Sequence, residues 1–364
     1  MREKVKSPKD KREARGSSIP RVARAVDALR RGEIVRIDAE TPLLALAVET
    51  APETALKAIK DPRLLITHAR ARTLKIRLYT PQIVALPVSP HMDMAELRAI
   101  ADPAADLDNP LKGPFRALRD PLPGSANAAV KLAKLAGLLP AVLVWSGAAR
   151  AAAAEIGAED VLDYEAETVR RLKIVTRAHV PLEDALQSEI VAFRAGDGAP
   201  EHYAIVIGAP PPHQPVLTRL HSECFTGDLL GSLKCDCGSQ LRGAIAAIAR
   251  AGSGVLIYLA QEGRGIGLIN KLRAYRLQDQ GFDTMDANER LGFGSDERLY
   301  GVAARMLALL GYDSVRLMTN NPDKVGALEA AGIKVVERVA HSFPAHAHNR
   351  AYLETKRKRA GHLL

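Results

Sequence analysis

From residue 201 onward, short apolar runs alternate with longer amphipathic segments. The runs typical of strands are "EHYAIVIGA", "PVLTRLHSE", "GVLIYLA", "SVRLMT" and "IKVVERV". The segments typical of helices are "GSQLRGAIAAIARAG", "LINKLRAYRLQDQG", "DERLYGVAARMLALLG" and "NNPDKVGALEAAG". Because helices that alternate with strands cover the faces of a shared sheet, this order predicts an α/β domain in the second half.

The first half has weaker patterns. "RVARAVDALRRGE" predicts a helix, "EIVRID" a strand, and "NAAVKLAKLAGLLPAVLVW" a helix followed by a buried strand. A chain of 364 residues is long enough for two domains, and its character changes between Asp163 and Gln187. We therefore predict a basic disordered tail at 1–20, a first domain at 21–170 and a second domain at 171–364.

The formal net charge of +9 lies mostly near the ends of the chain. The first 24 residues carry nine Lys/Arg against three Asp/Glu, and "KRKR" at 356–359 adds more. Aromatic residues are only 4% and do not interleave with these basic runs, so we expect solvated tails and no nucleic-acid partner. A basic pocket for a phosphorylated small molecule stays open. The alternative from another class is a zinc-stabilised nucleic-acid-binding protein that uses its tails.

Hydropathy and cysteine usage bear on the compartment. No apolar run reaches the roughly 18–20 residues of a membrane span, and the first residues lack the apolar stretch of a secretory signal. The three cysteines are an odd number and too few for a disulfide framework. We therefore expect a cytoplasmic protein without a membrane partner.

All three cysteines lie within fourteen positions, as Cys224, Cys235 and Cys237. Cys235 and Cys237 would leave the same face of an extended stretch, and Cys224 would fold back through a turn-rich segment. Three thiolates suit zinc and leave one coordination position for water, which is the arrangement of a catalytic site that hydrolyses at carbon. Two alternatives are three free buried cysteines, or a structural site completed by His221.

The loop "QEGRGIG", residues 261–267, joins a predicted buried strand to a helix. Backbone amides in such a place can hold a phosphate, although a tight structural turn explains the spacing equally well. Arg264 favours the anion, because its side chain could reach it.

Several other polar residues have ordinary structural explanations when the sequence is taken alone. Ser295 could cap a helix whose first turn contains Asp296 and Arg298. Tyr275 would be a core residue, Thr319 a cap and Lys324 a solvated charge. The three histidines of "HSFPAHAHN" resemble a metal cluster, but a mobile surface loop is the more common explanation; they are His341, His346 and His348.

Four segments together resemble GTP cyclohydrolase II, over roughly residues 172 to 364. They are "RLHSECFTGDLLGSLKCDCGSQL", "QEGRGIGLINKLRAYRLQDQGFDTMDAN", "LGFGSDERLY" and "TNNPDK". The resemblance implies an α/β domain with a mixed sheet and helices. It also implies an enzyme of riboflavin biosynthesis that opens the imidazole ring of GTP, releases formate and pyrophosphate, and forms 2,5-diamino-6-ribosylamino-4(3H)-pyrimidinone 5′-phosphate.

The resemblance also implies roles for individual residues. Cys224, Cys235 and Cys237 would bind one zinc ion, Tyr275 would assist at the ring, Arg298 would attack the α-phosphorus, and Asp296 would accept a proton. Mg²⁺ would bridge the GTP phosphates, and the chain would form a homodimer. The implied substrate contacts are Arg219, Leu220, His221, Ser222, Glu223, Gln240, Glu262, Gly263, Arg264, Thr284, Thr319 and Lys324.

Departures from the family pattern leave alternatives open. Ala260 stands where relatives commonly carry Arg. An enzyme that stops at a formylated intermediate, or one that acts on another nucleotide, is therefore a second possibility. Tyr275 argues against early arrest.

The first half resembles 3,4-dihydroxy-2-butanone 4-phosphate synthase, through "ALRRGEIVRIDAE" and "AAVKLAKLAGLLPAVLV". The acidic Arg-Glu-Asn-Glu motif of that family is replaced by "DAETPLLALAVE", and its His-Thr pair by Gly124-Ser125. We therefore predict a synthase-like α+β domain that has no synthase activity.

Overall fold

The computed structural model describes residues 18–107, 110, 112–196, 198–344, 354, 357–359 and 361. Most of the predicted basic tail lies outside these residues. The end predicted for that tail is wrong, because Ile19 and Pro20 already belong to helix α2 (Ile19–Arg30). Ile19 is fully buried in a core beside the second sheet, so apolar packing orders this part of the chain.

The first half contains a sheet with the strand order β4-β3-β5-β2-β1-β6. Neighbouring strands run antiparallel except for β1 and β6, which run parallel. The strands are β1 (Val35–Asp38), β2 (Leu43–Ala47), β3 (Arg63–Thr67), β4 (Ile83–Pro87), β5 (Ala141–Trp145) and β6 (Ala154–Gly157). The predicted strand and the predicted buried strand of this half therefore belong to one sheet, as β1 and β5, with β2 between them.

Helices cover both faces of the first sheet. On one face, α2, α5 and α6 pack against Ala45 and Leu65; on the other, α3 and α4 pack against Leu46 and Leu64. Alternate residues of β2 and β3 thus point into different cores, as the pleat of a strand requires. The further helices of this half are α3 (His68–Thr73), α4 (Met94–Ala101), α5 (Gly124–Leu135), α6 (Ala158–Leu162) and α7 (Tyr164–Arg171), with short 3₁₀ turns at Ala55–Ala58, Pro103–Ala105 and Ala149–Ala151.

The second sheet has the order β13-β12-β10-β11-β9-β8-β7. Strands β13, β12, β10 and β11 are parallel, and β9, β8 and β7 continue the sheet antiparallel, so the sheet is mixed. The strands are β7 (Lys173–His179), β8 (Ser188–Arg194), β9 (Glu201–Ile207), β10 (Val216–Ser222), β11 (Gly254–Leu259), β12 (Ser314–Met318) and β13 (Lys334–Val339). The helices of this half are α8 (Cys237–Arg250), α9 (Leu268–Asp279), α10 (Thr284–Arg290), α11 (Tyr300–Leu309) and α12 (Pro322–Ala330).

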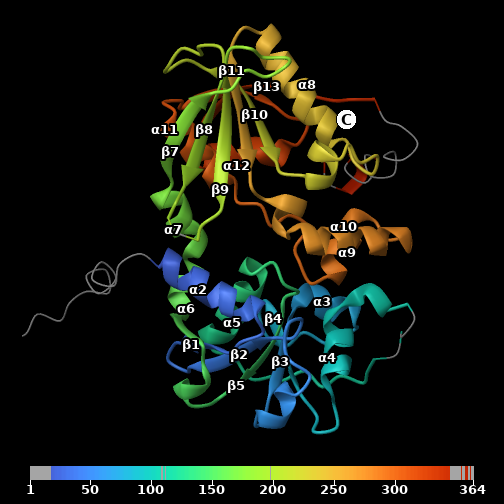
Figure 1. Ribbon diagram of the computed structural model, residues 1–364. Coiled ribbons are helices and arrows are strands. Elements are labelled where there is room, and N and C mark those ends of the chain that lie inside the picture. Colours follow the sequence, from blue (N-terminus) through green and yellow to red (C-terminus); the bar gives the residue numbers. More distant parts are fainter. Residues whose placement is uncertain are drawn as a thin grey trace, which may run out of the picture.

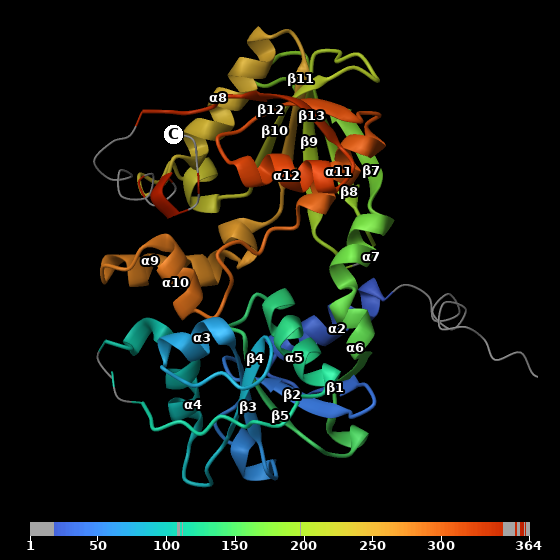
Figure 2. The same cartoon turned by 180° about the vertical axis from the view of Figure 1, so that it is seen from behind.

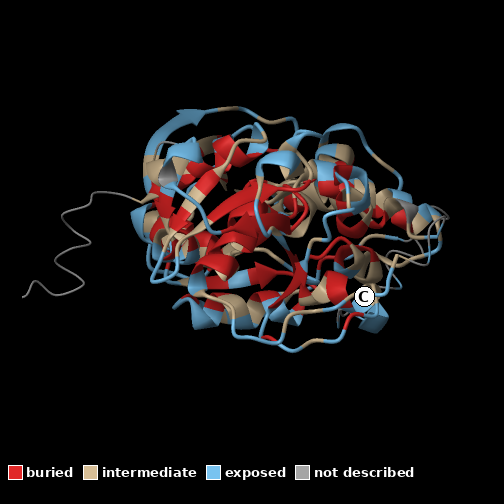
Figure 3. Cartoon of the chain, turned by 90° about the horizontal axis from the view of Figure 1, so that it is seen from below, coloured by how far each residue is buried: buried red, intermediate tan, exposed pale blue. Residues whose placement is uncertain are grey.

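Helices α9 and α10 lie between the two sheets (Figures 1 and 2). Leu277 of α9 and Ala287 of α10 share one apolar core with Leu46 and Leu97 of the first half. Seen from below, buried residues fill the interior and exposed residues the periphery (Figure 3). A segment of the second half therefore completes the core of the first. The domain boundary that we predict at residues 170–171 falls inside α7 and stays a prediction.

One local expectation is wrong, and one helix is missing from the predictions. The helix predicted from Asp296 begins only at Tyr300, because residues 294–298 form a loop that hydrogen bonds to the chain at Arg264. Helix α10 was not predicted; Asp283 caps it by accepting hydrogen bonds from the amides of Met285 and Asp286. Among the described residues, no helix is both long enough and apolar enough to cross a membrane.

His202 on β9 gives the fold a testable pH dependence. Its side chain is 3% exposed, its Nδ1 accepts a hydrogen bond from Ala260 at 3.1 Å, and burial lowers its pKa from 6.5 to about 4. Because the unfolded chain binds a proton that the folded chain does not, stability falls as the pH drops from 6.5 towards 4. The slope from this residue is at most about 1.4 kcal/mol per pH unit.

We expect His202→Asn, which keeps an acceptor near the Ala260 amide, to flatten this dependence. Denaturant unfolding of both proteins at pH 7.5, 6 and 5 measures it. Parallel stability curves would show that His202 does not carry the effect. His213→Asn, in an exposed loop, is the matched control.

Candidate active site

A pocket opens at the carboxyl ends of β10, β11 and β12, with residues of α8, α9, α10 and α12 around it. Among the residues that the sequence implicates, all but Asp296 line the pocket. The lining residues are Arg219, Leu220, His221, Ser222, Glu223, Cys224, Cys235, Cys237, Gln240, Glu262, Gly263, Arg264, Ile266, Lys271, Ala274, Tyr275, Gln278, Thr284, Asn288, Arg298, Thr319, Asn320, Asn321, Lys324 and His341. The pocket thus lies where ligands bind in open α/β sheets.

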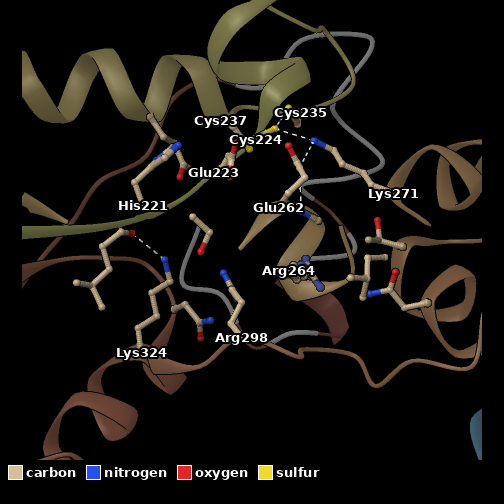
Figure 4. Close-up of a pocket in the computed structure, with 18 of the residues that line it drawn as sticks. His221, Glu223, Cys224, Cys235, Cys237, Glu262, Arg264, Lys271, Arg298 and Lys324 are labelled. Carbon is tan, nitrogen blue, oxygen red and sulfur yellow. Dashed lines mark hydrogen bonds and ion pairs between the residues drawn. The ribbon is translucent and has the colours of Figure 1, made fainter. Parts of the chain in front are cut away.

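The three cysteines converge at one end of this pocket (Figure 4). Their sulfur atoms all lie within 4.8 Å of one another, and Cys224 Sγ is 3.8 Å from Cys235 Sγ. The extended geometry predicted for Cys235 and Cys237 is wrong, because Cys237 is the first residue of α8. A tight π-helical turn at Phe225–Leu229 brings Cys224 back towards them.

Asp228 holds the turn after Cys224 in place. Its Oδ2 accepts hydrogen bonds from the Cys224 amide and the Tyr258 hydroxyl, each at 3.0 Å. His221 Nε2 lies 3.0 Å from both oxygens of the same carboxylate. His221 is therefore engaged with Asp228, and among the described residues only the three cysteines form a cluster suited to a metal. The idea of His221 as a fourth ligand finds no support in this geometry.

Lys271 on α9 is a site residue that the sequence did not reveal. Its Nζ lies 3.0 Å from Cys224 Sγ and 2.9 Å from Glu262 Oε1, and the residue is only 8% exposed. Hydrogen bonds from the Cys235 and Cys237 thiols, and then from Lys271, hold the pKa of Cys224 far below its ordinary value. The cluster thus favours a thiolate at Cys224. The only available signal for Lys271 was its place inside the "QEGRGIGLINKLRAY" segment.

The thiol cluster fits a soft or borderline metal ion. A Cβ added to Gly227 would lie 2.8 Å from Cys235 Sγ and 3.0 Å from Cys224 Sγ, so the turn passes directly against the sulfurs. Three sulfur donors of this spacing suit zinc, which binds thiolate sulfur at about 2.3 Å in tetrahedral sites. The donor chemistry and the close cradle therefore fit zinc, and zinc binding by these residues stays a prediction.

Arginine and lysine side chains line the other end of the pocket (Figure 4). Lys324 is 7% exposed and donates a hydrogen bond to the Leu220 carbonyl at 3.0 Å, so it is not the solvated charge expected from sequence alone. Arg219 is also buried, donates to the Met318 carbonyl at 2.9 Å, and has its pKa lowered by burial to about 10. Such buried cations are well suited to an anionic ligand, because a bound phosphate would offset their desolvation.

Arg298 lies in the pocket with Asp296 as its partner. Its Nε donates to Asp296 Oδ1 at 2.8 Å, and Tyr300 donates its hydroxyl to Oδ2 at 3.2 Å. Burial would raise the pKa of Asp296, but the hydrogen bonds and charge of Arg298 lower it. The pair is therefore charged, and it lies on a loop rather than in the first helical turn predicted.

The "QEGRGIG" loop has the strand-to-helix position predicted for it. Gly263 and Arg264 both have left-handed backbones, with φ of 64° and 63°. Gly265 approaches the next loop so closely that a Cβ there would lie 2.7 Å from the Glu297 carbonyl oxygen. The loop directs Glu262 towards Lys271, and Glu262, Gly263 and Arg264 line the pocket. It therefore forms a wall of the pocket.

Tyr275 and Thr284 border the pocket from α9 and α10. The Tyr275 hydroxyl lies 3.4 Å from Thr226 Oγ1, and burial raises its pKa to about 12. The expectation of a core tyrosine is wrong, because this face of α9 meets the cysteine turn. Gln278, one turn further along α9, donates to Thr284 Oγ1 at 3.2 Å.

His341 is not part of a surface loop. It is 7% exposed, its Nε2 lies 2.9 Å from the Gln240 carbonyl, and it packs edge-on against Phe343. His346 and His348 lie outside the described residues. Asn320, which donates to the His341 carbonyl at 2.7 Å, also lines the pocket, and only its place in "TNNPDK" could have indicated it.

We expect Gly227→Ala to lose bound metal, because the new methyl group would crowd two sulfurs of the cluster. Metal content of the purified protein, together with its melting temperature, measures this. Gly326→Ala on α12, where a Cβ meets nothing within 4 Å, is the matched control and should retain the metal. Full metal content in Gly227→Ala would contradict the thiol cradle.

The chain is similar to several known proteins. A sequence model of the family GTP cyclohydrolase II matches residues 173–340. GTP cyclohydrolase-2 of Azospirillum brasilense is 50% identical over 360 residues, covering 94% of each chain. GTP cyclohydrolase-2 of Histophilus somni is 51% identical over 194 residues, 53% of this chain and 89% of the relative.

One further relative and one solved structure also match the chain. Riboflavin biosynthesis protein RibBA of Bacillus cereus is 45% identical over 256 residues, 66% of this chain and 64% of the relative. The solved structure of RibBX, a two-domain 3,4-dihydroxy-2-butanone 4-phosphate synthase from A. baumannii, aligns with 88% of this chain and 99% of its own at 18% identity and a TM-score of 0.33. The near full-length match to the A. brasilense protein establishes that the chain belongs to the GTP cyclohydrolase II family, an enzyme family of riboflavin biosynthesis.

Proposed function

We propose that this enzyme opens the imidazole ring of GTP, releases formate and pyrophosphate, and leaves 2,5-diamino-6-ribosylamino-4(3H)-pyrimidinone 5′-phosphate. One observation carries the proposal: three thiols within 4.8 Å share a pocket with Arg298 and Lys324. The thiol end suits hydrolysis at a ring carbon, and the cationic end suits a triphosphate.

The metal would be held by Cys224, Cys235 and Cys237. Zinc bound there supplies a Lewis acid that makes water nucleophilic at neutral pH. The chain itself fixes the ligands: Asp228 holds the Cys224 backbone, and Lys271 donates to its sulfur at 3.0 Å. Such partners of a ligand set its orientation and basicity. Mg²⁺ on the phosphates and a homodimer stay predictions from the family resemblance, and the cytoplasmic location stays a prediction from hydropathy and cysteine usage.

Carboxylates and a phenol surround the position proposed for guanine. Burial raises the pKa of Glu223, with a further contribution from the charge of Glu262. Carboxylates here can accept hydrogen bonds from the N–H edge of guanine. Because the pKa of Tyr275 is about 12, its hydroxyl stays protonated at neutral pH and can donate a hydrogen bond at the ring. These residues would orient the base against the thiol end.

The phosphate chain would lie towards Arg219, Lys324 and Arg298. The family resemblance assigns Arg298 to the α-phosphorus and Asp296 to a proton, and their contact at 2.8 Å places a carboxylate beside the guanidinium. This geometry supports joint action of the pair. An arginine is ordinarily always protonated, so Asp296 would have to take its proton for it to act as a nucleophile.

The proposal predicts that protein loaded with zinc and Mg²⁺ turns GTP into formate, pyrophosphate and the diaminopyrimidine in equal amounts. Cys235→Ser removes one thiol and should abolish formate release, because the metal loses a ligand. Quantifying all three products against time tests this. Cys235→Ser that releases formate at the wild-type rate would contradict the metal role, and pyrophosphate without formate from wild type would contradict ring opening.

We also propose that the first half has no synthase activity. The chain has "DAETPLLALAVE" in place of the acidic family motif. The Ser125 hydroxyl donates a hydrogen bond to the Thr41 carbonyl at 2.7 Å. Ribulose 5-phosphate incubated with the purified protein and Mg²⁺ should remain unchanged. In a separate reaction the same protein should consume GTP. Formation of formate from ribulose 5-phosphate would contradict the proposal.

A further inference from the structure

The active site is built from two parts of the molecule. The thiols, Arg219 and Lys324 lie at the ends of the second sheet. Lys271, Tyr275 and Thr284 lie on α9 and α10, which pack into the core of the first half. The loop with Asp296 and Arg298 follows directly after α10. The wall of the pocket that contains Tyr275 and Arg298 is therefore supported from below by the first half (Figures 1 and 2).

Polar contacts between α9 and the first half fix its rotation. Arg273 donates to Glu49 Oε1 at 2.8 Å and to Asn270 Oδ1 at 2.8 Å. Asn270 is fully buried and donates to the Gly137 carbonyl at 2.9 Å. Arg273 stands between Lys271 and Tyr275 in the sequence of α9. Asn270 and Arg273 lie on a different side of α9 from Lys271 and Tyr275. Their contacts with the first half therefore hold Lys271 and Tyr275 towards the pocket.

A second connection between the two halves reaches the 294–298 loop, which contains Asp296 and Arg298. Lys134, in the last turn of α5, lies 2.6 Å from Glu297 Oε1. The same oxygen accepts the Gly294 amide at 2.6 Å, and the Glu297 amide donates to the Arg264 carbonyl at 3.1 Å. Glu297 thus joins α5, the 294–298 loop and the "QEGRGIG" loop at one point.

We infer that the first half serves this enzyme as a support that positions its active site, with Lys134 as a positioning residue for the loop of Asp296 and Arg298. The inference rests on the proposed function for its catalytic readout. It assigns a role to a half that we propose has no chemistry of its own. Lys134 is not among the residues that line the pocket, and it acts through Glu297.

The test compares two lysines on one helix. Lys134→Met removes the charge that holds Glu297. Lys131→Met, one turn earlier on α5, removes a similar ion pair, 2.8 Å long, with Glu165 on α7, away from the pocket. Lys134→Arg keeps the charge. Steady-state kcat and KM for GTP, zinc content and hydrogen exchange of residues 293–299 are measured for each.

Lys134→Met should lower kcat by about tenfold to a hundredfold, the size expected when a reacting group is misplaced by a fraction of an ångström to an ångström. Its KM should change by less than about threefold, because Arg219 and Lys324 stay in place. Zinc content should not change. Exchange at residues 293–299 should become faster, because the Gly294 amide loses a fixed acceptor. Lys134→Arg should restore kcat, and Lys131→Met should behave as wild type.

Two results would overturn the inference. One is unchanged exchange at residues 293–299 in Lys134→Met, which would mean that Lys134 does not hold the loop; this readout does not depend on GTP turnover. The other is a kcat in Lys134→Met equal to that of Lys131→Met. A different result would contradict only the proposed function. If exchange at residues 293–299 is faster in Lys134→Met than in wild type, but wild type releases no formate from GTP, the positioning role still stands.

Discussion

The packing of α9 and α10 into the first half is the contact on which the rest of the structure depends. Ile266, Leu277, Leu291 and Phe293 belong to the core that also contains Leu97. Burial of such side chains is worth about 1.5–3 kcal/mol each. The chain leaves the second sheet after β11, enters this core and returns as α11. Apolar burial therefore holds the active site at the junction of the two halves.

This arrangement builds the two sides of the site, the thiol end and the wall that faces it, from different parts of the molecule. The thiol end is a network at the carboxyl ends of the second sheet, where Asp228 fixes Cys224 and Tyr258 supports Asp228. The wall facing it comes from elements whose apolar side belongs to another core. A close-packed interior has few alternative arrangements, so a wall anchored in it keeps its place against the thiol end.

Buried charge at the site is compensated by close partners. Lys271 is nearly inaccessible, and both the Cys224 sulfur and Glu262 lie within about 3 Å of it. Ser222 Oγ and Arg219 Nε are buried without a hydrogen-bond partner within the described part of the chain. Since unpaired buried polar atoms are costly, these two atoms indicate the side of the pocket where a polar ligand would be most stabilised.

Sequence patterns predicted helices and strands correctly where local periodicity determines the structure. They predicted them incorrectly where contacts with distant segments determine it. The strand β11 and the helix α8 were predictable from their apolar spacing. The start of α11 was not, because the hydrogen bond between the Glu297 amide and Arg264 keeps residues 294–298 out of the helix. Local propensity contains no information about a partner more than thirty residues away.

The sequence by itself determined which residue types are available to the site: the three clustered thiols, the loop before α9, and Asp296 with Arg298. Only the tertiary structure decided that Lys324 is buried, that Tyr275 faces the pocket and that Lys271 meets Cys224. It also decided that Lys134 of the first half reaches Glu297. The physical reason is that residue types and short spacings are written along the chain, whereas burial and contact between distant segments exist only after both sheets have packed around α9 and α10.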